Sequence, residues 1–106
     1  MLTQDVAIET VRNYAYEIEA RGVHLRMVIL YGSFAKGMQH EWSDIDVALV
    51  ADEFTGFSFD DKKLFPYIGK DPYIRIETKT YPTDYFRKSD PFIEEIKKDG
   101  IVILSK

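Results

Sequence analysis

The sequence lacks cysteine altogether, and its 106 residues include only two histidines and one tryptophan. Without cysteine the chain can form no disulfide and no thiolate metal site, and this composition fits a reducing cytosol, so we expect a cytoplasmic protein. The start of the chain has no basic region followed by an apolar run, so no secretory signal peptide is expected. No apolar run is long enough to cross a bilayer, and we expect no membrane association.

An excess of positive charge is also missing, because the formal net charge is −4 at pH 7. A net-acidic surface repels phosphate backbones unless a basic patch or metal ions intervene. A broad surface for DNA or RNA is therefore not expected. A small phosphate-bearing molecule held through divalent cations remains compatible with this charge.

What the sequence does contain is the composition of an ordinary folded domain, with 45% hydrophobic and 30% charged residues. Its length corresponds to one domain, so we expect residues 1–106 to form a single domain without a linker or repeat. Helical and strand periodicities alternate along the chain. The expected elements are a helix between an N-cap at Thr3 and a stop at Gly22, a strand at Leu25–Tyr31, a short helix at Ser33–Met38 begun by Ser33, a strand at Asp44–Ala51, a short helix at Asp60–Phe65, a strand at Tyr73–Tyr81, a helix from Asp90-Pro91 to Gly100, and a strand at Ile101–Leu104.

These elements predict an α+β fold in which helices pack against a mixed sheet of about four strands. Along the third strand, side chains should alternate between the two faces. We expect one face to carry Ile74, Ile76 and Thr78, and the other Arg75, Glu77 and Lys79.

A glycine and a serine stand where the first buried strand is expected to turn into a short helix. Gly32 tolerates the backbone angles and the close approach that such a turn needs. Ser33 would present its hydroxyl beside the free N–H groups of a helix start, which attract phosphate. Lys36, one turn further on, could add positive charge or could be an ordinary solvated lysine. Alone, a Gly-Ser pair between a strand and a helix is common and weakly informative.

Two carboxylates, Asp44 and Asp46, stand two residues apart at the start of the next apolar strand. On a strand, this spacing sends both side chains to the same face, while Ile45, Val47 and Leu49 point to the other. Two carboxylates so close repel each other unless they share a proton or bind a cation, and Mg²⁺ prefers such oxygen ligands. An exposed edge face is the alternative for an isolated Asp-x-Asp pair. If the two strands are neighbours, the glycine turn and the carboxylates converge at one end of the sheet.

The motif Gly32-Ser33-Phe34-Ala35-Lys36-Gly37, followed by Ser43-Asp44-Ile45-Asp46, resembles that of a known family. It is similar to the minimal nucleotidyltransferase group of the DNA polymerase β-like superfamily, which implies a nucleotidyltransferase-like fold. The spacing of ten residues between Ser33 and Asp44 also suits this family. The order of helix, strand, motif and strand is similar too, as is the ending from Pro91 to Leu104, so the resemblance covers most of the chain.

The resemblance implies a role for each matched residue. Gly32 and Ser33, with Lys36 and Ser43 beside them, would bind a nucleoside triphosphate, expected to be ATP. Asp44 and Asp46 would bind Mg²⁺, expected as two ions. A third carboxylate on a later strand would complete the metal site and help to deprotonate the attacking hydroxyl.

Glu77 is the only well-placed candidate for this third carboxylate, in the segment Tyr73-Ile74-Arg75-Ile76-Glu77. Many relatives carry Asp there, so Glu77 would be a longer-armed variant that can also ligate Mg²⁺. The alternative is an exposed strand residue that pairs with Arg75 or Lys79.

Two functions follow from the resemblance. The first is Mg²⁺-dependent transfer of a nucleotidyl group, expected to be AMP from ATP, to a hydroxyl acceptor. Since so short a chain lacks room for its own acceptor-binding domain, a partner protein or a homo-oligomer should complete the site, and a tyrosine of a HEPN-type toxin would be a fitting acceptor. The second is a catalytically silent, antitoxin-like module that neutralises its partner by contact. The third carboxylate discriminates between them.

Overall fold

The computed structural model describes residues 2–65 and 73–106, and the chain forms a four-stranded sheet in the order β3-β2-β1-β4. Strand β1 is antiparallel to both β2 and β4, whereas β2 and β3 are parallel, so the predicted mixed α+β sheet is confirmed. The elements are α1 (Gln4–Ala20), β1 (Leu25–Tyr31), α2 (Ser33–Lys36), β2 (Ile45–Ala51), α3 (Ser58–Asp61), η1 (Lys62–Leu64), β3 (Ile76–Pro82), α4 (Thr83–Lys88), α5 (Pro91–Asp99) and β4 (Ile101–Ser105).

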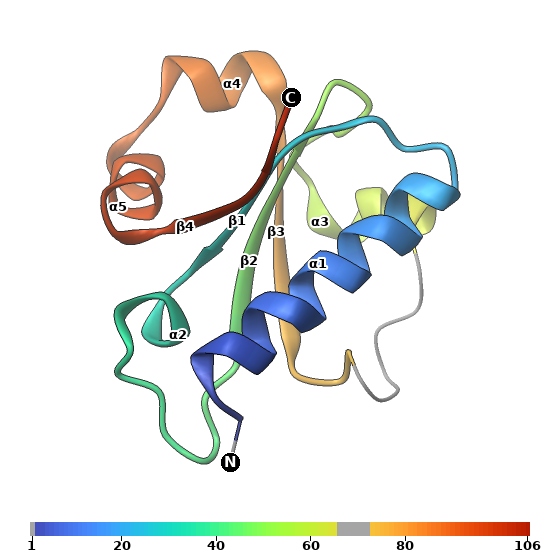
Figure 1. Cartoon of the computed structure of the whole chain (residues 1–106). Coiled ribbons are helices and arrows are strands. Elements are labelled where there is room, and N and C mark those ends of the chain that lie inside the picture. Colours follow the sequence, from blue (N-terminus) through green and yellow to red (C-terminus); the bar gives the residue numbers. More distant parts are fainter. Residues whose placement is uncertain (1, 66–72) are drawn as a thin grey trace.

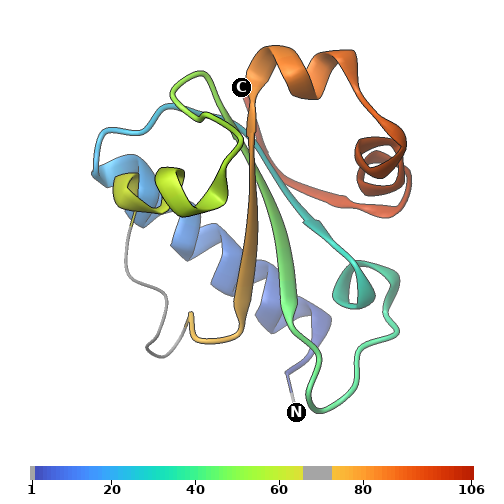
Figure 2. The same ribbon diagram turned by 180° about the vertical axis from the view of Figure 1, so that it is seen from behind.

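Helices cover the sheet from both sides. Helix α1 crosses one face, and α4 and α5 lie over part of the other, as the two opposite views show (Figure 1, Figure 2). The apolar side chains divide accordingly, because successive strand residues point to opposite faces. The α1 side buries Val28, Leu30, Ile45, Val47, Leu49 and Ile76, and the α4/α5 side buries Ile29, Ala48, Val50 and Tyr81.

Helix α1 follows its sequence signals closely. The Thr3 hydroxyl accepts a hydrogen bond from the Val6 N–H (3.2 Å), as expected of an N-cap. The helix ends at Ala20, and Gly22 follows with a φ of 95°, which suits a glycine better than any other residue. The side chains predicted to be buried by helical spacing are fully or almost fully buried: Ala7, Val11, Tyr14, Ala15 and Ile18.

The last helix is also confirmed. An Asp90 carboxylate oxygen accepts from the Ile93 N–H (2.8 Å), and Pro91 occupies the first turn. Ile93 and Ile96 are buried against the sheet, but Phe92 is 44% exposed. Its ring makes an edge contact with Tyr31, so it lies at the border of the covered area.

Strand β3 is shorter at its start than predicted. Residues 73–75 form a turn in which the Ile76 N–H donates to the Tyr73 carbonyl (3.0 Å), and pairing with β2 begins only at Ile76. Ile74, expected to share a strand face with Ile76 and Thr78, therefore lies before the strand and is 58% exposed. Strand β2 likewise begins at Ile45, one residue after the predicted start, so that Asp44 belongs to the preceding loop.

Three short helices differ from the prediction. Helix α2 ends at Lys36 because Gly37 adopts a left-handed conformation, and its N-cap is Gly32 rather than the serine. The helix expected at Asp60–Phe65 divides into α3 and the 3₁₀ turn η1, and its proposed limits at Pro66 and Gly69 lie outside the described residues. Helix α4 was not predicted, since its six residues carry only two buried side chains.

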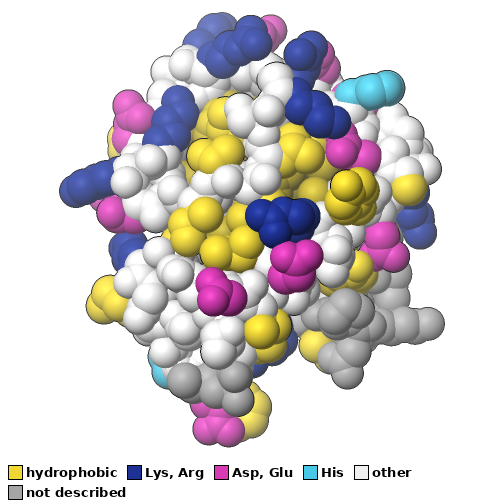
Figure 3. Space-filling model, viewed as in Figure 1, with side chains coloured by type: hydrophobic (Ala, Val, Ile, Leu, Met, Phe, Trp, Pro, Cys, Tyr) yellow, Lys and Arg dark blue, Asp and Glu magenta, His cyan; other side chains and the backbone are white. Residues whose placement is uncertain are grey.

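Strand β4 forms one edge of the sheet. Ile103 and Leu104 are half-buried against the main core, whereas Val102 on the opposite face is 55% exposed. Hydrophobic side chains are visible on the α1 side of the molecule in the region beside this strand (Figure 3).

Candidate functional site

Strand pairing brings the predicted carboxylates and the glycine turn to one end of the sheet. Asp46 on β2 pairs with Tyr31 on β1 and with Glu77 on β3. Gly32 directly follows Tyr31, and Asp44 directly precedes β2. We call this end of the sheet, with Gly32, Asp44, Asp46 and Glu77, the carboxylate end.

The carboxylate of Asp46 lies directly against the backbone of Gly32. A Cβ atom placed on Gly32 would come within 2.3 Å of the Asp46 Oδ2 atom. The glycine also has φ 75° and ψ −152°, a region that residues with a side chain scarcely populate. Both the space and the backbone angles therefore require glycine here, and a carboxylate occupies the room that a side chain would take.

Asp46 and Glu77 project on the α4/α5 side of the sheet, because Ala48 and Tyr81, which share their alternation, belong to the core on that side. Helix α4 lies toward the other end of the strands, as Figure 2 shows. Asp46 is consequently half-buried, and Glu77 and Asp44 are exposed. The acidic side chains thus stand on a part of the sheet face that is open to solvent.

The carboxylates share one electrostatic environment. The pKa of Asp46 is raised above its usual range by partial burial and then by the nearby charges of Asp44 and Glu77. Burial, together with the charges of Asp46 and Glu77, raises the pKa of the adjacent Tyr31 to about 12. The phenol therefore stays neutral and the three acids repel one another.

No cation within the described residues neutralises these acids. None of the ion pairs found at 4.0 Å or less includes Asp44, Asp46 or Glu77. The alternative for Glu77, pairing with Arg75 or Lys79, is not observed in this part of the chain. Arg75 instead donates to main-chain carbonyls, and the Lys79 ammonium lies over the ring of Phe92 (4.3 Å to its centroid).

The acids are close enough to interact but are not gathered into a preformed cage. Among residues 2–65 and 73–106, no group of three or more Asp, Glu or His side chains is placed to hold a metal ion. Mg²⁺ commonly uses one or two protein carboxylates and takes its other ligands from water and substrate phosphates. The donor set at this end of the sheet fits that pattern of binding rather than an all-protein site.

Helix α2, which carries Ser33 and Lys36, is fastened at its C-terminal side. The Gln4 side-chain amide donates to the carbonyls of Phe34 (2.8 Å) and Ala35 (3.2 Å). Ser33 is half-buried at the first helical position, and the Lys36 ammonium lies 4.0 Å from an oxygen of Asp99. Gln4 was not identified from the sequence, because nothing local indicates that its side chain reaches α2.

Ser43 has a structural partner in the loop before β2. Its hydroxyl accepts from the His40 N–H (2.9 Å), and its own N–H donates to the His40 carbonyl (3.0 Å). The residue is 6% exposed. In this conformation the Ser43 hydroxyl holds a tight turn together and does not project from the loop.

A cleft of about 420 Å³ runs along β3 beyond Glu77, and none of the four residues of the carboxylate end lines it. Lys79, two residues beyond Glu77 on the same face, lines it together with aromatic side chains. Its remaining lining includes Phe57, Tyr81, Tyr85, Asp90 and Phe92. Tyr85 is held there by a hydrogen bond from its hydroxyl to Asp90 (2.6 Å).

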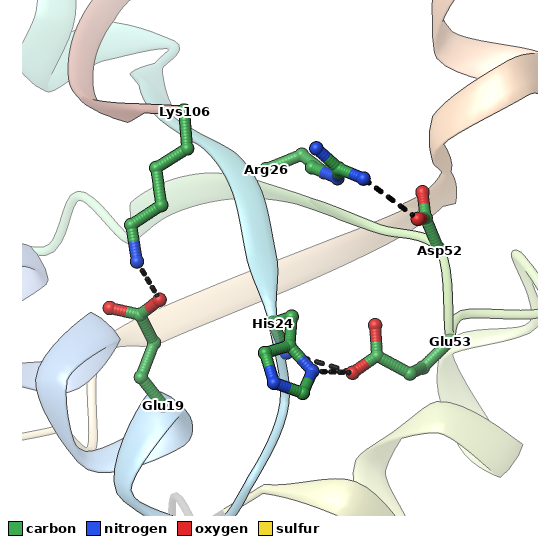
Figure 4. A network of polar contacts seen from close by, with 6 residues as sticks. All are labelled: Glu19, His24, Arg26, Asp52, Glu53 and Lys106. Carbon is green, nitrogen blue, oxygen red and sulfur yellow. Dashed lines mark hydrogen bonds and ion pairs between the residues drawn. The ribbon is translucent and has the colours of Figure 1, made fainter.

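The opposite end of the sheet also has a hollow, of about 710 Å³, but its charges are paired. Arg26 lies 3.2 Å from Asp52, His24 donates its N–H to Glu53 (2.8 Å), and Lys106 pairs with Glu19 (Figure 4). We call this region the paired end. Its acids are engaged by neighbouring side chains and offer no open ligand set.

In the part of the chain that the structure describes, no helix combines the length and the apolar character needed to cross a bilayer.

The fold and the carboxylate end can be compared with known proteins. A sequence model of the family described as polymerase beta, nucleotidyltransferase, matches residues 16–106. No curated protein matches the chain. Solved structures share the fold at low sequence identity. A toxin–antitoxin crystallised with AMP-PNP has 18% identity and a TM-score of 0.63, with 90% of this chain and 73% of that chain covered.

Two further structures are similar. A candidate nucleotidyltransferase from Sulfolobus solfataricus has 17% identity and a TM-score of 0.66, covering 97% of this chain and 84% of that chain. A mutant of the toxin–antitoxin MntA-HpeT has 17% identity and a TM-score of 0.58, covering 99% and 75% respectively. At these low identities the similarity shows a shared fold and nothing more.

Proposed function

Because the chain belongs to the polymerase beta nucleotidyltransferase family, we propose that it transfers a nucleotidyl group, AMP from ATP, to a hydroxyl acceptor with the help of Mg²⁺. One observation carries the proposal: Asp46 is paired in register with Glu77, lies against Gly32, and has no cationic partner among the described residues. The raised pKa of Asp46, in a group of acids open to solvent, is typical of a functional site. It does not stabilise the fold.

Asp46 and Asp44 are the proposed Mg²⁺ ligands, with Glu77 as the third carboxylate. The donor chemistry fits, since these oxygens are uncompensated and a cation beside them would relieve their repulsion. When bound, Mg²⁺ would neutralise charge on the phosphates and polarise the phosphorus that is attacked. Gly32 and Ser33 are the proposed phosphate-binding residues, with Lys36 beside them, and Ser43 is proposed to act there through the turn that its hydroxyl closes.

The proposed reaction is an in-line displacement. The acceptor oxygen forms a bond to the α-phosphorus, and the bond from that phosphorus to the bridging oxygen breaks, so that pyrophosphate leaves. The proton of the acceptor hydroxyl passes to the Glu77 carboxylate, which is exposed and has no ion-pair partner in the described residues. Most of the rate enhancement would come from positioning and charge stabilisation.

A protein is the proposed acceptor. The structures with a similar fold include two toxin–antitoxins, one of them crystallised with AMP-PNP. By analogy, we propose that a HEPN-type toxin is the partner and that one of its tyrosine hydroxyls is the acceptor, with a homo-oligomer as the other way to complete the site.

The proposal includes two further expectations: residues 1–106 form one domain, and the protein works in the cytoplasm.

Transfer of radiolabel from α-³²P-ATP tests the proposal. Asp44→Asn and Asp46→Asn should each lower transfer by at least about 100-fold, because each removes charge that the transition state uses. Asp52→Asn, at the paired end, should transfer label like the wild type. Equal transfer by the wild type and by both variants at the carboxylate end would contradict the proposal.

The absence of a ready three-acid metal group in the described residues favours a second candidate, a catalytically silent module that binds a toxin. Titration calorimetry separates the two. Binding of Mg²⁺ and ATP by the isolated protein supports the transferase. Binding of the partner without any binding of Mg²⁺ and ATP supports the silent module.

A further inference from the structure

Both peptide groups of Asp44 are bound by one residue from a distant part of the chain. The Arg75 guanidinium donates through its Nη2 atom to the Ser43 carbonyl, on the N-terminal side of Asp44. The Arg75 carbonyl accepts from the Ile45 N–H (2.8 Å), on the C-terminal side. Asp44 itself is exposed and precedes the strand, so these contacts hold its backbone where no strand pairing does.

The same guanidinium fastens the loop one step further back. Its Nη2 atom also donates to the Glu41 carbonyl (2.8 Å). Within the loop, the Ser43 N–H and hydroxyl close a turn on His40. Arg75 therefore binds the carbonyls of a turn that is also closed by its own hydrogen bonds, and the same residue binds the first residue of β2.

Arg75 uses its donors on carbonyls although unpaired carboxylates lie close by. It forms no ion pair with Asp44, Asp46 or Glu77 in the described part of the chain. A guanidinium forked onto Asp44 would occupy the oxygens that a ligand needs. Arg75 is thus placed to orient the acid without neutralising it.

Arg75 also stands two residues before Glu77 in the same segment, and Glu77 pairs with Asp46 across β2 and β3. Its contacts to the backbone on both sides of Asp44 link the first carboxylate of the site to the strand that carries the third. We propose that Arg75 is a positioning residue, which sets the place of Asp44 relative to Asp46 and Glu77. The role in metal binding rests on the proposed function, whereas the restraint on the loop does not.

The first test measures the restraint alone. In Arg75→Ala, amide hydrogen exchange of residues 41–45 should accelerate at least about tenfold, because the loop loses its side-chain donors. Trp42 lies within this loop and is the only tryptophan, so its fluorescence anisotropy should fall in the same variant. Arg12→Ala is the matched control, since Arg12 is an exposed arginine paired with Glu9 on α1. Exchange and anisotropy equal to the wild type in Arg75→Ala would overturn the proposal.

The second test measures Mn²⁺ binding by electron paramagnetic resonance, with Mn²⁺ in place of Mg²⁺. Residues that orient metal ligands typically change metal affinity by about 10–100-fold. We expect a loss in this range for Arg75→Ala, a smaller loss for Arg75→Lys, which keeps donors on a shorter arm, and no loss for Arg12→Ala. Unchanged Mn²⁺ affinity in a folded Arg75→Ala that has lost the restraint would refute the positioning role.

Failure of the two proposals can be told apart. If the wild type binds no Mn²⁺, the proposed function fails, and the exchange and anisotropy data still decide whether Arg75 restrains Asp44. If circular dichroism shows that Arg75→Ala does not fold, hydrogen exchange, anisotropy and Mn²⁺ binding are measured on Arg75→Gln and Arg75→Lys instead. These data then test whether Arg75 restrains Asp44. Wild-type values in both variants would then overturn the proposal.

Discussion

The two ends of the central sheet treat acidic side chains in opposite ways. At the paired end, Glu53 accepts hydrogen bonds from the backbone and ring of His24, and these outweigh partial burial and lower its pKa. At the carboxylate end, burial and two neighbouring acids raise the pKa of Asp46. The acids at the paired end are compensated by neighbouring groups of the chain, whereas those at the carboxylate end have no ion-pair partner among the described residues.

The comparison shows that the amount of acid is a poor guide to a functional site. Both ends have acids near strand termini, and the paired end has the hollow of about 710 Å³. The difference lies in the partners. The acids at the paired end contact Arg26, His24 and Lys106, whereas Asp46 at the carboxylate end has two other acids as its charged neighbours. Repulsion between uncompensated carboxylates lowers the stability of the fold. Such destabilising features are typical of functional sites, so the carboxylate end is the better candidate for one.

Exchanging a matched glutamate at each end gives the largest expected effect. Glu77→Gln should reduce nucleotidyl transfer by about 10²–10⁴-fold, the usual contribution of a group that accepts the attacking proton. Glu53→Gln should transfer label at the wild-type rate. Initial rates with α-³²P-ATP measure both, and a Glu77→Gln variant as active as Glu53→Gln would remove the third carboxylate from the mechanism.

Substituting a glycine near each end gives the next largest effect, on stability. Gly32→Ala should lower the free energy of unfolding in urea by about 3 kcal/mol, because an unfavourable backbone region alone costs about 1–3 kcal/mol. Asp46 must also move away from the new methyl group, since it would otherwise lie 2.3 Å from the added carbon.

Gly22→Ala is the matched control for this experiment. Gly22 also has a positive φ, of 95°, but an added Cβ would meet nothing within 4 Å. The loss should be about 1–2 kcal/mol, the strain of a left-handed backbone. An equal loss of unfolding free energy in the two variants would show that the contact between Gly32 and Asp46 does not contribute to stability.

The pKa of Asp46 predicts an unusual stabilising mutation. Since its folded-state pKa lies above its unfolded value, ionised Asp46 opposes folding at neutral pH, and this penalty disappears as pH falls below its unfolded value of about 4. Asp46→Asn should therefore raise Tm by roughly 2–5 °C at pH 7 while transfer is lost. Scanning calorimetry between pH 4 and 7 should show the advantage shrinking as the pH falls.

Asp61 is the control with the opposite sign. It is buried, and hydrogen bonds from Thr55, Gly56 and Thr80 outweigh its burial and lower its pKa. Asp61→Asn should lower Tm at pH 7, and the difference from wild type should narrow as the pH falls through the folded-state pKa. A fall in Tm for Asp46→Asn as well would show that repulsion at the carboxylate end is negligible.

The smallest effect is expected from breaking an exposed pair at the paired end. Lys106→Ala removes the partner of Glu19 and should change the free energy of unfolding by less than about 1 kcal/mol, since the lysine side chain is 55% exposed and its charge is screened by solvent. The change should diminish further in high salt. Urea unfolding at two salt concentrations measures it, and a loss above 2 kcal/mol would mean that the paired end supports the fold more than its exposure implies.

Local signals identified much of the fold from the sequence. Thr3 and Asp90 are both N-caps, and capping depends on residues only a few positions apart. The alternation along Ile45–Ala51 correctly assigned Asp46 and Ile45 to opposite faces, because the side-chain period of a strand is local geometry. Helix α4 was missed because so short a helix, placed directly after Pro82, has little periodicity to detect.

The sequence by itself determined the N-caps at Thr3 and Asp90, the strand alternation and the motif that belongs to the nucleotidyltransferase family, since these depend on neighbouring residues. Only the tertiary structure decided that Asp46 lies beside both Gly32 and Glu77, and that Arg75 binds the backbone around Asp44 across 30 or more positions of chain. The physical reason is that strand register is set by packing of the whole sheet, and register determines which distant side chains meet.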